Sequence, residues 1–210
     1  MAITNGYADL DQFKAQMRIT VNDLVDDARM ELSIAAASRQ IDAHCGRRFW
    51  QDATVVDRQF YADNSRICHV DDISTLSGLI VKVDDDDDGT FETTLTITTN
   101  YIVRPLNAAD MVPVHPFTEL VLVDSNGAVS FPVHGTGRPG VQVTAKFGWP
   151  AIPDDVTKAC LVQAGLLFKA DDASLGAIQF ADAGVALRMQ NRLHPVAEAL
   201  LEPYCKPRVG

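Results

Sequence analysis

The spacing of apolar residues predicts two helices at the start of the chain. Asp9 stands where it would cap a short helix whose apolar face holds Leu10, Phe13 and Met17. A longer helix is predicted from about Asp23 to Cys45, with Gly46 ending it in a left-handed conformation. This helix carries two apolar stripes, which are Leu24, Ala28, Leu32 and Ala35, and Met30, Ile34, Ala37, Ile41 and Cys45. Because a small domain rarely covers a helix on two sides, one stripe is predicted to face a neighbouring subunit.

The middle of the chain alternates apolar and polar residues with a period of two, as Val141 to Phe147 do, which predicts strands. Turn signals at Asp88-Gly89 and Asn126-Gly127, together with the glycines of 135–140, separate the predicted strands. The strands are expected at 54–61, 66–70, 79–83, 93–98, 101–104, 118–124, 128–133 and 141–147. This spacing favours a compact antiparallel sheet or a small barrel.

Helices return after Pro153-Asp154-Asp155, which is typical of a helix start. A central helix is predicted from Val156 to Ala170, followed by a loop over 171–184 and a short helix that opens at Pro195. The segment from Pro203 onward is predicted to lack regular structure. The fold class is therefore α+β. A helical bundle of residues 1–50 and 151–202 would carry an inserted antiparallel β domain at 51–150 and a C-terminal tail at 203–210.

Composition and charge narrow the classes of function. The 210 residues are 47% hydrophobic and 22% charged, which is ordinary globular usage and predicts a soluble protein without a membrane span. No secretory signal is recognised at the start, so the four cysteines are expected to be reduced thiols. The net charge is −10, and residues 51–150, with fourteen acids and six bases, carry −8 of it. A negative protein is not drawn to DNA phosphates, which argues against sequence-specific DNA binding.

Two glycine-containing motifs suggest ligands. Residues 135–140 match GxGxxG, but a strand rather than a helix is predicted to follow, which favours a turn over a dinucleotide site. The run Asp84 to Gly89 contains DxDxDG, with Glu92 at its ninth position, as in loops that wrap calcium. Leu95 stands at the twelfth position, where a bidentate Glu is expected. The run is interpreted as a solvated hairpin tip, with weak cation binding as the alternative.

No catalytic or metal constellation is recognised in the sequence. The pairs His44-Cys45 and Cys68-His69 lack the spacing of a zinc finger. The other histidines, His115, His134 and His194, stand in unlike contexts, and there is no GxSxG, HExxH or P-loop lysine motif. We therefore expect no enzyme activity, no catalytic residue, no metal site and no cofactor.

Two further groups of residues are candidates for protein contacts. Arg47 and Arg48 precede Phe49-Trp50, and they are either a solvated pair beside core aromatics or residues that cross a subunit boundary together with Ala37. In the tail, Tyr204, Lys206 and Arg208 form an aromatic and cationic segment that two prolines stiffen. This tail is expected to be flexible until it docks on a partner.

An ordered set of short motifs spans nearly the whole chain. In chain order these are YADL at 7–10, IDAHCGRRF at 41–49, VDDDDDGTFET at 83–93, NYIVRPLN at 100–107, FGWPAIP at 147–153 leading into Val156 to Ala159, and LLEPY at 200–204. The set resembles the head–tail connector (head-to-tail adaptor) proteins of long-tailed bacteriophages. It looks most like the adaptors of phages of actinobacteria.

The resemblance implies a structural virion protein without catalytic activity. About twelve copies would form a ring beneath the portal protein and above a stopper or tail-completion protein, in the neck that joins capsid to tail. The ring would line the passage of viral DNA without reading its sequence, and assembly would take place in the host cytoplasm. The resemblance also implies that the C-terminal segment, with Tyr204, Lys206 and Arg208, engages the portal. A cytoplasmic small-ligand or cation-binding protein that uses the Asp84–Asp88 loop remains the alternative.

Overall fold

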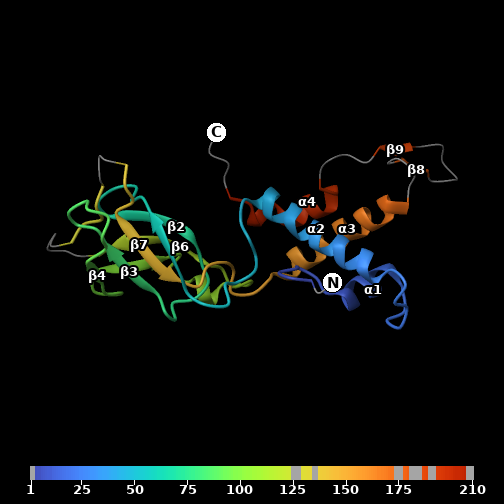
Figure 1. The fold of residues 1–210 in the computed structure, drawn as a ribbon, viewed down its shortest axis with the longest axis horizontal. Helices are drawn as coiled ribbons and strands as arrows, with labels where there is room; N and C mark the ends of the chain where they lie inside the picture. The colour runs from blue at the N-terminus through green and yellow to red at the C-terminus, as the bar shows by residue number, and fades with distance from the viewer. Residues whose placement is uncertain are drawn as a thin grey trace. The chain divides into compact units, whose positions relative to one another are not determined.

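A computed structural model describes residues 3–123, 129–133, 137–172, 177–179, 186–188 and 193–206. The chain divides into two compact units (Figure 1). The helical unit comprises Met1–Trp50 and Ile152–Gly210, and the β unit comprises Gln51–Ala151. The predicted α+β class, with helices at both ends and an inserted antiparallel β region, is confirmed. None of the helices in the described ranges is long and apolar enough to cross a membrane.

The first helix, α1 (Leu10–Met17), begins at the predicted cap. The Asp9 carboxylate accepts the N–H of Gln12, and the Gln12 side chain accepts the N–H of Asp9, which is a capping box. Helix α2 (Asp27–Cys45) ends as predicted at left-handed Gly46. It begins four residues later than expected because the buried ammonium of Lys14 binds the carbonyl oxygens of Val21 and Asp23 and the carboxylate of Asp27.

The remaining helices are α3 (Asp154–Asp172) and α4 (Pro195–Leu201). Helix α3 contacts α1, α2 and α4, which confirms its predicted central place. The Phe13 ring of α1 meets the Phe168 ring of α3 edge-on at 5.9 Å. The predicted loop at 171–184 is wrong in part, because α3 continues to Asp172 and β8 (Ala177–Gln179) pairs with β9 (Ala186–Arg188). This alanine-rich stretch shows no alternation of period two, so its sequence does not predict the hairpin.

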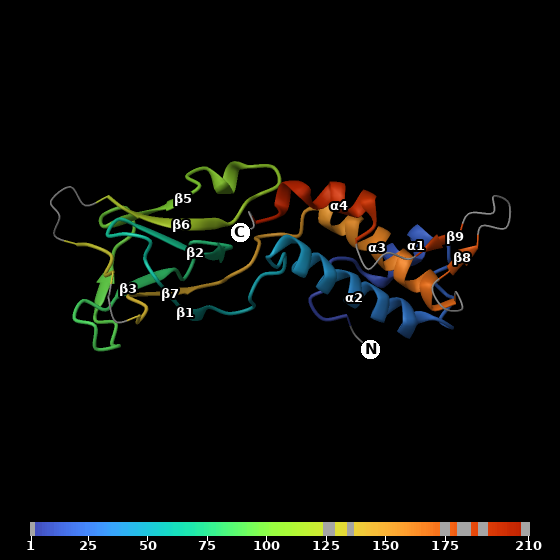
Figure 2. The ribbon, with the colours of Figure 1, turned by 90° about the horizontal axis from the view of Figure 1, so that it is seen from above.

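The β unit contains two antiparallel sheets, seen as separate layers in Figure 2. One sheet has the order β1-β7-β3-β4 and the other β2-β6-β5. Their bounds are β1 (Val56–Phe60), β2 (Ile67–Ile73), β3 (Ile80–Val83), β4 (Thr93–Leu95), β5 (Tyr101–Arg104), β6 (Phe117–Leu122) and β7 (Val141–Ala145). Buried residues from β2 to β7 form one hydrophobic cluster, so the two sheets share a core.

Two predicted strands differ most from the structure. Elsewhere β2 continues three residues past the predicted 66–70, to Ile73, and the other strand ends shift by at most two residues. The strand at 93–98 ends at Leu95, since Thr98 adopts a left-handed φ of 67° and its N–H bonds to the carbonyl of Tyr101 in a turn. The strand at 128–133 is wrong over 129–133, where the described backbone is irregular. Pro132 has no backbone N–H to donate to a strand ladder. The Phe131 side chain is buried in the core, and its backbone N–H donates a hydrogen bond to the carbonyl of Ser65. Residue 128 lies outside the described ranges.

Candidate functional site

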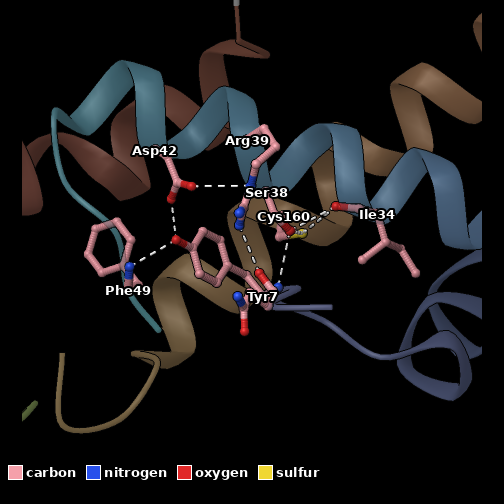
Figure 3. A network of polar contacts seen from close by, with 8 residues as sticks. Tyr7, Ile34, Ser38, Arg39, Asp42, Phe49 and Cys160 are labelled. Carbon is pink, nitrogen blue, oxygen red and sulfur yellow. Dashed lines mark hydrogen bonds and ion pairs between the residues drawn. The ribbon is translucent and has the colours of Figure 1, made fainter. Parts of the chain in front are cut away.

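A network of polar contacts fixes the N-terminal segment to α2 (Figure 3). The hydroxyl of Tyr7 donates a hydrogen bond to the Asp42 carboxylate and accepts the N–H of Phe49 at 2.8 Å. Arg39 pairs with Asp42 at 3.2 Å and donates to the carbonyl of Asn5 at 2.8 Å. The network joins the start of the chain to the end of α2. These segments contain two of the short sequence motifs, at 7–10 and 41–49.

Burial raises the pKa values of the two acidic side chains in this network, Tyr7 and Asp42. Desolvation raises the pKa of the Tyr7 hydroxyl, and its hydrogen bond to the Asp42 carboxylate raises it further. Desolvation also raises the pKa of Asp42, although the bond from Tyr7 and the charges of Arg39 and Arg48 oppose that rise. Every partner lies within the helical unit, and Tyr7 itself is buried. The network is therefore a structural clamp rather than a reactive centre.

The two apolar stripes predicted for α2 differ in solvent exposure. The stripe of Met30, Ile34, Ala37, Ile41 and Cys45 is buried within the helical unit. In the other, Leu32 is 65% exposed, Ala28 is exposed and Ala35 is half-buried. The turn before α2 continues this surface, with Val21, Leu24 and Val25 at 58%, 70% and 89% exposure. We call these five residues (Val21, Leu24, Val25, Ala28 and Leu32) the outer face, because each is an apolar residue that is exposed to solvent.

The three residues predicted at a subunit interface lie in different environments. Ala37 is 0% exposed and packs inside its own helical unit, so it has no surface to offer a neighbour in this conformation. Arg47 and Arg48 are half-buried. The guanidinium of Arg48 stacks over the ring of Trp50 at 4.0 Å, which is a cation–π contact within the unit. An interface role for the two arginines stays a prediction.

The C-terminal segment is more firmly attached than the sequence predicts. Tyr204 is 5% exposed, its ring meets the Phe49 ring edge-on at 5.9 Å, and its hydroxyl donates to Asp155 at 3.0 Å. Lys206 is half-buried, and its backbone N–H donates to the Cys45 carbonyl at 2.9 Å. A 3-10 helix covers Glu202–Tyr204, so the expectation of no regular structure from Pro203 is wrong there. Arg208 lies outside the described residues.

The aspartate run forms the predicted hairpin tip between β3 and β4, but its first member is not solvated. Asp84 is 0% exposed, and its carboxylate accepts the N–H groups of Asp87 and Gly89 at 2.8 and 2.9 Å. One ligand atom from each of Asp84, Asp86, Asp88 and Glu92 lies within 4.8 Å of the others. Carboxylate oxygens are the ligands that Ca²⁺ prefers, so this cluster is the part of the loop where a cation would bind.

The other candidate motifs lie in separate contexts. The pair His44-Cys45 belongs to the helical unit and the pair Cys68-His69 to the β unit. His69 pairs with the Asp63 carboxylate at 2.8 Å on the surface. Residues 137–140 of the glycine-rich stretch lead into β7 rather than a helix, as the turn interpretation expects. His134 and residues 135–136 lie outside the described ranges. Among the residues that the structure describes, only the aspartate cluster gathers three or more potential metal ligands.

Solved structures share this architecture, although the sequence matches no protein-family model and no curated protein. A chain from the neck of an empty gene transfer agent particle, computed with C6 symmetry, aligns with a TM-score of 0.55 at 17% identity. Chains from the virion of a native gene transfer agent particle and from its neck computed with C12 symmetry give 0.52 and 0.50, each at 16% identity. Each alignment covers 100% of this chain and 94% of the other. The chain shares its fold with these three. The likeness extends over both units and establishes the fold alone.

Proposed function

We propose that this chain is a structural virion protein, a head-to-tail adaptor that forms a ring under the portal and joins the DNA-filled capsid to the tail. The observation that carries the proposal is the full-length alignment with a chain from the neck of a gene transfer agent particle, which covers 100% of this chain and 94% of that chain. An alignment that includes both units in one order supports a common role more than a match of one unit would.

The outer face is the proposed contact between neighbouring copies in the ring. Its occupant is a second copy of this chain, because the similar structures belong to necks computed with C6 and C12 symmetry, in which a chain recurs around an axis. Leu24, Val25 and Leu32 expose aliphatic side chains whose burial against a neighbour would stabilise assembly. We propose a ring of about twelve copies, the number that the resemblance implies.

The charge of the β unit is compatible with a DNA passage. The unit holds fourteen acids and six bases, a net −8. Phosphates find few cations there to replace their counterions, so DNA would pass without adhering and without its sequence being read. A stopper or tail-completion protein is the proposed partner on the tail side.

The portal contact is proposed for the C-terminal segment. Tyr204 anchors the segment inside the helical unit, so we assign it a positioning role. Lys206 and Arg208 supply cations beyond that anchor, and these are the proposed contact residues. The anchor limits the freedom of the segment before docking, which lowers the entropy lost on binding.

One experiment tests the proposed function directly. The purified chain is mixed with a portal protein of its own phage and examined by negative-stain microscopy and by size measurement. The expected result is a ring of this chain on one end of the portal, or a ring formed by the chain alone. A chain that stays monomeric in the presence of portal, and that does not co-sediment with it, contradicts the adaptor role.

The aspartate loop gives the test of the alternative function. We expect Asp86→Asn with Asp88→Asn to change the melting temperature little, with or without calcium, because both side chains are exposed. Asp84→Asn should lower the stability by about 1–3 kcal/mol, since one of the two N–H groups that its carboxylate binds would lose its acceptor. Thermal melts with calcium or with chelator measure both. A large calcium-dependent rise in the parent that disappears in the double variant would favour a cation-binding protein instead.

A further inference from the structure

Two cysteines that are far apart in the sequence lie side by side in the helical unit. The Sγ atoms of Cys45 and Cys205 are 3.6 Å apart, although 160 positions separate the residues. Cys45 is the last residue of α2, and Cys205 directly follows the 3-10 helix at Glu202–Tyr204. The backbone bond from the Lys206 N–H to the Cys45 carbonyl holds the two segments together. The two thiols therefore lie side by side because the backbone segments that carry them are bonded to each other.

The two thiols differ in exposure. Cys45 is 1% exposed, whereas Cys205 is half-buried and lines a surface hollow of about 400 Å³ together with His44, Pro195, Glu198, Ala199 and Glu202. Burial raises the pKa of the Cys45 thiol well above its usual value. A small oxidant in solution thus meets Cys205 first. Cys45 is positioned behind it as the second thiol.

We infer that Cys45 and Cys205 form an intramolecular disulfide when the protein meets a small peroxide oxidant. The Cys205 thiolate attacks one oxygen of hydrogen peroxide and breaks the O–O bond, which gives a sulfenic acid and releases water after proton transfer. The Cys45 sulfur then attacks the Cys205 sulfur, a second water leaves, and the S–S bond forms. Two thiols and one peroxide become one disulfide and two waters, so the two sulfurs are oxidised and the peroxide is reduced.

The geometry allows this bond with a small movement. The sulfurs must approach from 3.6 Å to the bonding distance of about 2.05 Å. The other two cysteines are placed differently. Cys68 belongs to the β unit, and Cys160 is buried in α3, where its thiol meets the hydroxyl of Ser38 and the carbonyl of Ile34. The sequence alone predicts reduced thiols, whereas the structure brings the sulfurs of Cys45 and Cys205 within reach of each other.

The disulfide would close a loop that contains the whole β unit and α3. Cross-linking positions so far apart removes much of the freedom of the unfolded chain. It would also fasten the C-terminal segment covalently to the end of α2. Oxidation is therefore expected to stabilise the helical unit and to hold Tyr204 and Lys206 in place.

The test uses the full chain, treated with hydrogen peroxide or with a reductant, then alkylated and mapped by peptide mass spectrometry. We expect one cross-linked peptide pair containing Cys45 and Cys205, with a mass lower by two hydrogen atoms, while Cys68 and Cys160 are alkylated after denaturation. The oxidised chain should melt at least about 5 °C higher than the reduced chain. Cys205→Ser should remove both effects, and the matched control Cys68→Ala should retain them.

Three outcomes would overturn the inference. Peroxide could leave both thiols reactive, it could take Cys205 to a sulfinic acid with Cys45 still reduced, or it could link Cys205 of one chain to Cys205 of another. Peptide mapping of the parent distinguishes these results without any variant, so a variant that fails to fold does not weaken the test.

Discussion

Deleting residues 203–210 is expected to lower the free energy of unfolding of the helical unit by about 3–5 kcal/mol, the usual cost of removing a large buried aromatic side chain. The deletion takes away the Tyr204 ring, which is 5% exposed and packs edge-on against Phe49. It also removes the hydrogen bond from Tyr204 to Asp155 and the backbone bond from Lys206 to Cys45. A tail that is flexible before docking, as the sequence predicts, would instead leave the stability nearly unchanged when deleted.

A shorter deletion provides the matched control. Removing only 207–210 keeps Tyr204 and Lys206, so the stability should stay within about 0.5 kcal/mol of the parent. Under the proposed function this variant folds but binds portal more weakly, because Arg208 is lost. Chemical denaturation measures the stability and a pull-down measures the binding. Equal stability of the parent and the 203–210 deletion would show that Tyr204 does not anchor the segment.

Ala37→Glu is expected to disrupt the helical unit, with a loss of at least about 4 kcal/mol in stability. Ala37 is 0% exposed on the buried stripe of α2, where Ile34 and Ile41 are equally buried. A carboxylate at this position would be desolvated on a buried helix face, which is strongly unfavourable. The expected readout is loss of the cooperative thermal transition of the helical unit.

A substitution at the neighbouring residue, Ala36, tests assembly without disturbing the fold. Ala36 is exposed on α2, four positions after Leu32. Because Glu forms helices well, Ala36→Glu should change the stability by less than about 0.5 kcal/mol. It would place a charge beside the outer face, so ring formation, or binding of the chain to a portal-bound neighbour, should fail. Light scattering and microscopy measure assembly. If Ala36→Glu assembles like the parent while Ala37→Glu unfolds, the outer face is not the interface.

The fold shared with the solved neck chains does not depend on many shared residues. The motifs from 7–10 to 200–204 are short, and at 16–17% identity the solved structures share few residues with this chain. The shared feature is the fold over both units, which in this chain places helices at both ends and the β unit between them. Such a fold can be shared at low identity because the period of apolar residues specifies each element, while individual side chains can change.

The sequence by itself determined the class of fold and most of the elements. Helix α1 with its Asp9 cap, the end of α2 at Gly46 and the start of α3 follow from local chemistry, in which a side chain or a backbone conformation acts on its own neighbours. The two stripes of α2 were visible for the same reason, because apolar spacing along one helix is a local property.

Only the tertiary structure decided which stripe is buried, that Asp84 is satisfied by its own loop, and that Tyr204 belongs to the core. It also brought Cys45 to Cys205 and Tyr7 to Asp42, across 160 and 35 positions. Apart from the contacts inside the Asp84 loop, these facts depend on which distant surfaces meet, and one sequence does not specify that. The burial of α2 on one side follows from its packing against α3, whose position is fixed by the whole helical unit rather than by any local pattern.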